Sequence, residues 1–145
     1  MVQKAGEREL QSLTQLAIEL WKGHTFKELE EEISFLLRQK EAAFFLKYKD
    51  GIPVGFAQCQ LRHDYVEGTD STPVGYLEGV YVQKAYQRRG YAKELLQACE
   101  NWAAKMGCVE FASDCELDNA ESLGFHLSAG FAEVNRIICF QKKLR

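Results

Sequence analysis

The sequence lacks the features that mark several large classes of protein. No uninterrupted apolar run approaches the roughly 20 residues that a membrane-spanning helix requires. The first residues, Met-Val-Gln-Lys, do not form the apolar core of a secretory signal. Internal repeats, low-complexity tracts and Pro/Gly/Ser-rich linkers are also missing. We therefore expect one cytoplasmic domain spanning residues 1–145, with no membrane partner.

Cysteine is present, but in no pattern that binds a metal or builds a disulfide framework. The five cysteines include no Cys-x-x-Cys pair, and their spacing fits no zinc site. An odd number of cysteines in an expected cytoplasmic chain favours free thiols. A free cysteine is more often a small core residue than a nucleophile, so we expect neither metal nor thiol chemistry.

Positive charge is in deficit, since 18 Lys and Arg face 21 Asp and Glu, which disfavours nucleic acid as a partner. Two stretches, 64–78 and 110–121, hold acidic residues and no Lys or Arg. If they face one another they form a pocket for a cation, and otherwise they are two solvated loops. Their acidic residues are Asp64, Glu67, Asp70 and Glu78, and Glu110, Asp114, Glu116, Asp118 and Glu121.

Helix and strand patterns alternate along the chain. Apolar spacings of three and four predict helices over 7–21, 25–38, 90–106 and 119–129. Thr25 and Glu28 have the spacing of a capping box, and Asp50-Gly51 is a tight-turn signal. Strand-like segments occupy 2–5, 43–49, 54–62, 74–82, 109–114 and 131–144, the last as one or two strands. The expected fold class is α/β or α+β, layered on a mixed sheet.

A short turn between the strand ending at Val82 and the third helix has the composition of an anion site. A turn entering a helix presents unpaired N–H groups, and the helix dipole adds positive potential there. Glycine lets the backbone approach a diphosphate closely, whereas the alternative is an ordinary helix start with two solvated arginines. The turn matches neither the P-loop nor the dinucleotide-binding glycine motif. It reads Gln87, Arg88, Arg89, Gly90, Tyr91 and Ala92.

In this context the turn resembles the Gln-x-x-Gly-x-Ala signature of the GNAT superfamily of N-acetyltransferases. A second motif of that superfamily is matched by Asn119, Ser122, His126 and Gly130-Phe131. The resemblance implies acetyl-CoA as donor and a mixed sheet of about six or seven strands flanked by four helices. It further implies that backbone groups near Val80 and Val82, together with Asn119, bind the pantetheine arm, and that the turn binds the pyrophosphate.

Four segments resemble aminoglycoside 6′-N-acetyltransferases more narrowly. The resemblance implies direct acetyl transfer, in a ternary complex, to the 6′-amine of an antibiotic, and it suggests a homodimer. A polyamine, a small metabolite or a protein amine remains an alternative acceptor, and a non-catalytic acyl-CoA sensor is an alternative of another class. The segments are Leu20–His24, Arg62–Val66, Tyr76–Val80 and Phe111–Asp114.

Three side chains are candidates for the chemistry. An amine must be neutral to attack a thioester, so a proton acceptor is needed beside the acyl group. Glu78 is the first candidate and Asp114 the second. Because a carboxylate beside an ammonium also stabilises its charge, either one could be the base and the other the residue that binds the ammonium. His126 stands where many GNAT members have a tyrosine that protonates the leaving thiolate, and it is either that acid or a packed helix residue.

Candidates for the acceptor pocket come from the loops. The flat rings of Trp21, His24 and Tyr65 suit the faces of a sugar, although Trp21 is equally a core residue. The carboxylates of Asp64, Glu67 and Asp70 could pair with the distal amines of a bound cation.

Overall fold

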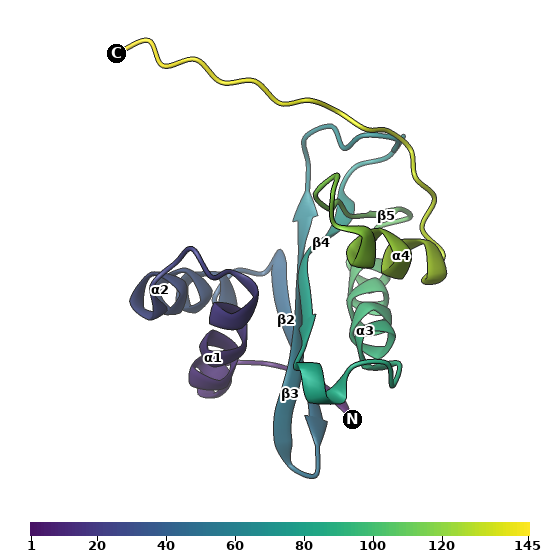
Figure 1. The fold of residues 1–145 in the computed structure, drawn as a ribbon. Helices are drawn as coiled ribbons and strands as arrows, with labels where there is room; N and C mark the ends of the chain where they lie inside the picture. The colour runs from purple at the N-terminus through teal and green to yellow at the C-terminus, as the bar shows by residue number, and fades with distance from the viewer.

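The computed structural model describes residues 1–145 and is built on one five-stranded sheet (Figure 1). The sheet order is β1-β2-β3-β4-β5; neighbours are antiparallel except β4 and β5, which are parallel. Helices α1 and α2 cover one face, and α3 and α4 lie on the other. The strands are β1 (Val2–Lys4), β2 (Ala42–Lys49), β3 (Ile52–Arg62), β4 (Val74–Val82) and β5 (Phe111–Ala112). The helices are α1 (Leu10–Leu20), α2 (Phe26–Leu37), α3 (Tyr91–Lys105) and α4 (Ala120–Ser128), with 3₁₀ turns at Glu7–Glu9 and Lys84–Tyr86.

The sheet is buried on both faces, which explains the almost continuous apolar run of β2. Successive side chains of a strand point to opposite faces. Phe44 accordingly joins the cluster beneath α1 and α2, whereas Phe45 joins the cluster beneath α3. Burying each such side chain contributes about 1.5–3 kcal/mol.

Local signals in the sequence correspond closely to the helix ends and turns. The predicted capping box is confirmed, with the Thr25 hydroxyl accepting from the Glu28 N–H at 3.1 Å and the Glu28 carboxylate from the Thr25 N–H at 3.0 Å. The predicted turn is confirmed as well, since Asp50 and Gly51 both have positive φ, 52° and 77°. None of the helices is both long and apolar enough to cross a membrane.

The fold class is as predicted, but the expected strand count of about six or seven is wrong, because the sheet has five strands. The segment predicted as a strand over 109–114 is paired only at Phe111–Ala112. Residues 131–145 form no strand and run away from the body of the molecule (Figure 1). A strand requires another strand to pair with its N–H and C=O groups, and no strand of this chain pairs with this segment, although Asn135 donates to Glu67. We call residues 131–145 the C-terminal arm; its exposed apolar side chains are Val134, Ile137, Ile138, Phe140 and Leu144.

Candidate active site

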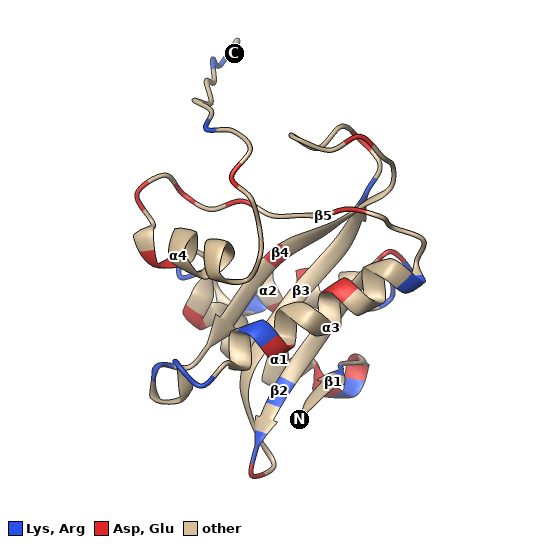
Figure 2. Ribbon diagram, turned by 90° about the vertical axis from the view of Figure 1, so that its right-hand side faces the viewer, with Lys and Arg blue, Asp and Glu red and all other residues tan.

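The turn before α3 has the geometry of an anion nest. Gly90 is the N-cap residue of α3 and has a φ of 82°, in the left-handed region that glycine tolerates best. The Gln87 side chain donates to the Val82 carbonyl at 2.8 Å, which braces the turn from inside rather than leaving the amide free for a ligand. Arg88 and Arg89 are exposed, and the turn is blue in Figure 2. The turn therefore offers helix N–H groups framed by two arginines.

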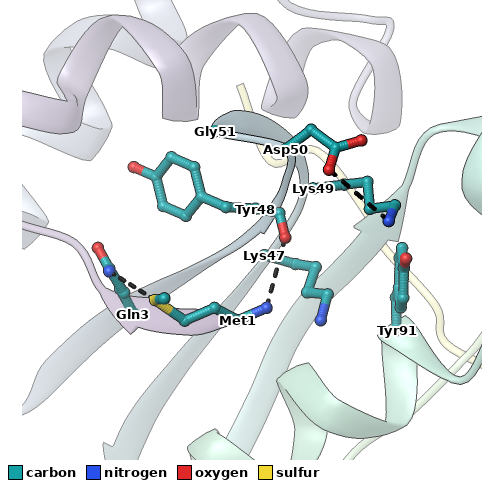
Figure 3. Close-up of a pocket in the computed structure, with 8 residues that line it drawn as sticks. All are labelled: Met1, Gln3, Lys47, Tyr48, Lys49, Asp50, Gly51 and Tyr91. Atoms are coloured by element: carbon teal, nitrogen blue, oxygen red, sulfur yellow. Dashed lines mark hydrogen bonds and ion pairs between the residues drawn. The ribbon is translucent and has the colours of Figure 1, made fainter.

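The first turn of α3 is tied to the sheet by a buried lysine. Lys47 on β2 has a side chain only 8% exposed, and its ammonium lies 2.7 Å from Glu94 and 4.4 Å from the centre of the Tyr91 ring. The hydrogen bond to Glu94 raises the pKa of Lys47. Lys47 and Tyr91 line a hollow of about 650 Å³ together with residues at the N-terminus, on β2 and in the turn after it (Figure 3). The contact holds the start of α3, and hence the turn, in place.

Beyond its second paired residue, β4 has no strand neighbour on the β5 side. The parallel pairs are Gly75 with Phe111 and Tyr76 with Ala112. From Leu77 to Val82 this side, which we call the open edge, carries no ladder, and the predicted cofactor residues Val80 and Val82 lie on it. The open edge ends at the turn before α3, so an extended ligand could pair with it as an added strand does.

A β-bulge sets Glu78 apart on β4. Gln58 of β3 pairs with Gly79 and Cys59 pairs with Leu77, so Glu78 has no partner residue on β3. A bulge interrupts the alternation of side chains and re-aims the residue that it contains. Glu78 therefore falls outside the regular alternation of side chains along β4, at the start of the open edge.

A chain of contacts joins the two predicted carboxylates. The Arg62 guanidinium donates to both oxygens of Glu78, at 3.1 and 2.8 Å, and lies 3.4 Å from the centre of the Tyr76 ring. The Tyr76 hydroxyl donates to Asp114. Hydrogen bonding to Glu78 raises the pKa of Arg62, while burial, followed by the bond to Asp114, raises that of Tyr76. Glu78 is thus paired with an arginine in the structure.

Sequence reasoning missed Arg62 and Tyr76 as site residues. Both stood in segments that carried the finer resemblance, but neither was assigned a role. The sequence did hold one signal, because the predicted strands 54–62 and 74–82 follow one another. Paired antiparallel, they bring Arg62 beside the first residues of β4.

The two acidic stretches lie against each other. One Glu110 oxygen accepts from the Asp70 N–H at 2.9 Å and from the Ser71 hydroxyl at 2.5 Å, and these bonds lower the pKa of Glu110. The carboxylates of Asp64, Glu67 and Asp70 are exposed in the loop after β3. Figure 2 shows red segments in the loops on both sides of β5. A hollow of about 430 Å³, lined by Leu61, Arg62, His63, Asp64 and Tyr65, lies in this region.

The predicted aromatic residues fall into different settings. Trp21 packs edge-on against the core residue Phe56, with ring centres 5.7 Å apart, and a Cβ added to Gly79 would lie 2.6 Å from its indole. It is therefore a half-buried residue that packs against the core and also lies close to β4 beside Glu78. Tyr65 is 76% exposed and donates to Glu67, whereas His24 is exposed in the loop after α1. Neither ring is hydrogen-bonded to Glu78 or Asp114.

Asn119 and His126 both make contacts within α4. The Asn119 side-chain oxygen caps the helix by accepting from the Ser122 N–H at 3.0 Å. His126 lies 2.7 Å from the Ser122 carbonyl through Nδ1 and 2.7 Å from the Ser113 hydroxyl through Nε2. Ser113 follows β5 directly and had no role assigned from the sequence.

Comparison with known proteins places this geometry among acetyltransferases. The model of the acetyltransferase (GNAT) family matches residues 9–131. The chain is 38% identical to aminoglycoside N(6')-acetyltransferase type 1 of Acinetobacter haemolyticus, over 99% of this chain and 98% of the relative. It is 35% identical to the enzyme of the same name from Salmonella enteritidis, over 98% of each.

Solved structures agree with the fold. The AAC(6')-Iy complex with the bisubstrate analogue CoA-S-monomethyl-acetylneamine superposes with a TM-score of 0.95, at 35% identity over 99% of this chain and 97% of that one. Apo AAC(6')-IG from Acinetobacter haemolyticus gives a TM-score of 0.94, at 36% identity over 100% and 99%. The resemblance and the fold class predicted from the sequence are therefore confirmed.

Proposed function

Since the chain belongs to the acetyltransferase (GNAT) family, we propose that it transfers acetyl from acetyl-CoA to the 6′-amine of aminoglycosides. The transfer is direct, within a ternary complex. The observation that carries this proposal is the open edge of β4, which runs from the Arg62–Glu78 pair at one end to the anion nest before α3 at the other. A donor with a diphosphate and an extended amide arm fits that order of features.

The donor half is assigned to backbone groups. The N–H groups of Arg88 to Ala92 hold the pyrophosphate, and nothing fills the cradle at Gly90, since a Cβ there would meet no atom within 4 Å. The open edge at Val80 and Val82 pairs with the pantetheine amides, and Asn119 lies at the start of α4 beyond β5. An N–H near Val80 stabilises the oxyanion that forms at the acyl carbon.

The acceptor half is assigned to carboxylates. Glu78 receives the proton that the ammonium loses, directly or through one water, because the bulge places it at the start of the open edge. Arg62 holds that carboxylate in one orientation through two bonds. Asp114 accepts from a neutral phenol and forms no ion pair, so its charge is available to anchor the ammonium. Asp64, Glu67 and Asp70 bind the distal amines, and Trp21, His24 and Tyr65 line the sugar pocket.

Residues 1–145 act as one cytoplasmic N-acetyltransferase domain and assemble as a homodimer in this proposal. Free cysteines support a reducing compartment, because none of the five forms a disulfide. The exposed apolar side chains of the C-terminal arm support the homodimer, because an arm with no pairing strand in its own chain can pair with a second copy.

Release of CoA with kanamycin- or neomycin-type acceptors tests the proposal. The control acceptor is a congener that carries a 6′-hydroxyl in place of the 6′-amine. We expect turnover with the amine and none with the control. Turnover with spermidine alone would assign the acidic loops to a polyamine instead. Stabilisation by acetyl-CoA without CoA release for any amine would contradict catalysis and identify a binding module.

A further inference from the structure

The imidazole of His126 is fixed between α4 and β5 in one orientation. Its ring lies 5.1 Å from the Phe131 ring and 5.5 Å from the Phe125 ring, centre to centre. Both ring nitrogens have partners, the Ser122 carbonyl at Nδ1 and the Ser113 hydroxyl at Nε2. The histidine therefore has no free nitrogen to turn toward a ligand.

The partners of the ring determine which nitrogen carries the proton. A carbonyl oxygen only accepts hydrogen bonds, so Nδ1 must be the protonated nitrogen of the neutral ring. Nε2 then carries the lone pair and accepts from the Ser113 hydroxyl at 2.7 Å. A serine hydroxyl that donates to an imidazole, which is itself held by a third group, is the arrangement of an activated hydroxyl.

Ser113 occupies the point where β4 and β5 separate. The last parallel pair joins Tyr76 to Ala112, and Ser113 is the first residue after β5. On β4 the open edge begins at the next residue, Leu77, immediately before Glu78. Asp114 follows Ser113 and accepts from Tyr76, so the backbone that carries both residues lies where the proposed reaction centre begins. The Ser113 hydroxyl oxygen keeps lone pairs for a second partner while it donates to His126.

We propose that Ser113 and His126 form a proton relay that carries a proton from the attacking nitrogen to the departing sulfur of CoA. This inference rests on the proposed acetyl transfer. An ammonium loses one proton before it attacks, which Glu78 receives and passes to solvent. It loses another after the C–N bond has formed, and that second proton is the one that the relay handles.

The step balances without any further reagent. The adduct nitrogen gives its proton to Ser113 Oγ as the Ser113 proton passes to His126 Nε2. When the C–S bond breaks and sulfur takes the electron pair, Ser113 Oγ–H protonates the thiolate. His126 Nε2–H then restores the serine hydroxyl. Serine and histidine end each turnover in the state in which the structure shows them.

Single-turnover rates of acetyl transfer test the relay, with Ser113→Ala as the main variant and Ser113→Thr as the matched control that keeps the hydroxyl. We expect Ser113→Ala and His126→Gln each to lower the rate about 100-fold, and Ser113→Thr to stay within about fivefold of the wild type. Acetyl-CoA affinity and the melting temperature should change little in all three. Equal rates for the alanine variant and the wild type would overturn the relay while leaving the proposed function intact.

A measurement on the wild type covers the case in which the alanine variant does not fold. The single-turnover rate should fall in D₂O with a proton inventory that requires more than one proton in flight. A rate unchanged in D₂O would contradict the relay. An acetylated Ser113 peptide, found after mixing with acetyl-CoA alone, would overturn it in favour of a covalent intermediate. A wild type that releases no CoA with any amine would remove the proposed function and the relay together.

Discussion

The two halves of the proposed site are built from different materials. The donor half consists of backbone: the open edge of β4, the left-handed Gly90 and the first turn of α3. The acceptor half consists of side chains, in which Arg62 links the carboxylate of Glu78 to the ring of Tyr76. Backbone geometry tolerates most side-chain changes, whereas a charged network does not. The two substrates should therefore be separable by mutation.

The largest effect is expected in the acceptor half, from Glu78→Gln. Loss of the proton acceptor should lower kcat/KM for the amine about 100- to 1,000-fold, while the Kd of acetyl-CoA stays unchanged. Steady-state kinetics and calorimetric titration of acetyl-CoA measure the two quantities. Glu31→Gln, an exposed carboxylate on α2, is the control and should change neither. Equal losses in both quantities would break the separation between the halves.

A smaller effect is expected from Arg62→Met. Glu78 then loses its bidentate partner and its fixed orientation, so kcat/KM for the amine should fall about tenfold. Arg62→Lys keeps the charge but not the two-point contact, and it should recover only part of the loss. Steady-state kinetics at saturating acetyl-CoA measure both variants. Full activity in the methionine variant would show that Arg62 does not position Glu78.

In the donor half, the same Gly→Ala change can be made at two sites. Gly90→Ala places a Cβ on a residue with φ of 82°, at a cost of about 1–2 kcal/mol, and should weaken acetyl-CoA binding about fivefold to tenfold. Gly124→Ala lies within α4, where a Cβ meets no atom within 4 Å, and should leave acetyl-CoA binding unchanged. Titration of acetyl-CoA and amine kinetics at saturating donor separate the effects. A changed KM for the amine in the Gly90→Ala variant would show that the donor and acceptor halves are not separable.

The smallest effect is expected from the two hydrogen bonds that Glu110 accepts from Asp70 and Ser71, which we call the clamp between the acidic loops. Because Ser71 and the Asp70 N–H lower the pKa of Glu110 below its ordinary value of 4.5, the clamp stabilises the fold fully above that pH. Its contribution is lost as the pH falls through the lowered pKa. Glu110→Gln should therefore melt below the wild type at neutral pH, and the difference should shrink in acid. Melting curves from pH 7 to pH 3 measure it, and a constant difference would contradict the clamp.

The sequence predicted well what depends on neighbouring residues. The capping box at Thr25, the turn at Asp50-Gly51 and both ends of β4 follow from local patterns. The Gly90 turn is local too, because a glycine before an amphipathic helix carries its own signal.

What the sequence did not predict depends on pairing between distant segments. The Arg62–Glu78 contact requires the register of β3 against β4 and the bulge that isolates Glu78. The bond from Tyr76 to Asp114 requires the parallel register of β5. The extra strands expected over 131–144 had the right composition, but a strand also needs a neighbour, and composition does not supply one.

The acidic rim formed by Asp64, Glu67 and Asp70 has a consequence for substrate binding and product release. Acetylation converts one ammonium of a polycation into a neutral amide, so the product carries less positive charge than the substrate. The field that draws the substrate in therefore holds the product more weakly. Acetylation thus lowers the electrostatic attraction that would slow release of the product. The rim thereby favours replacement of the acetylated product by a new substrate molecule.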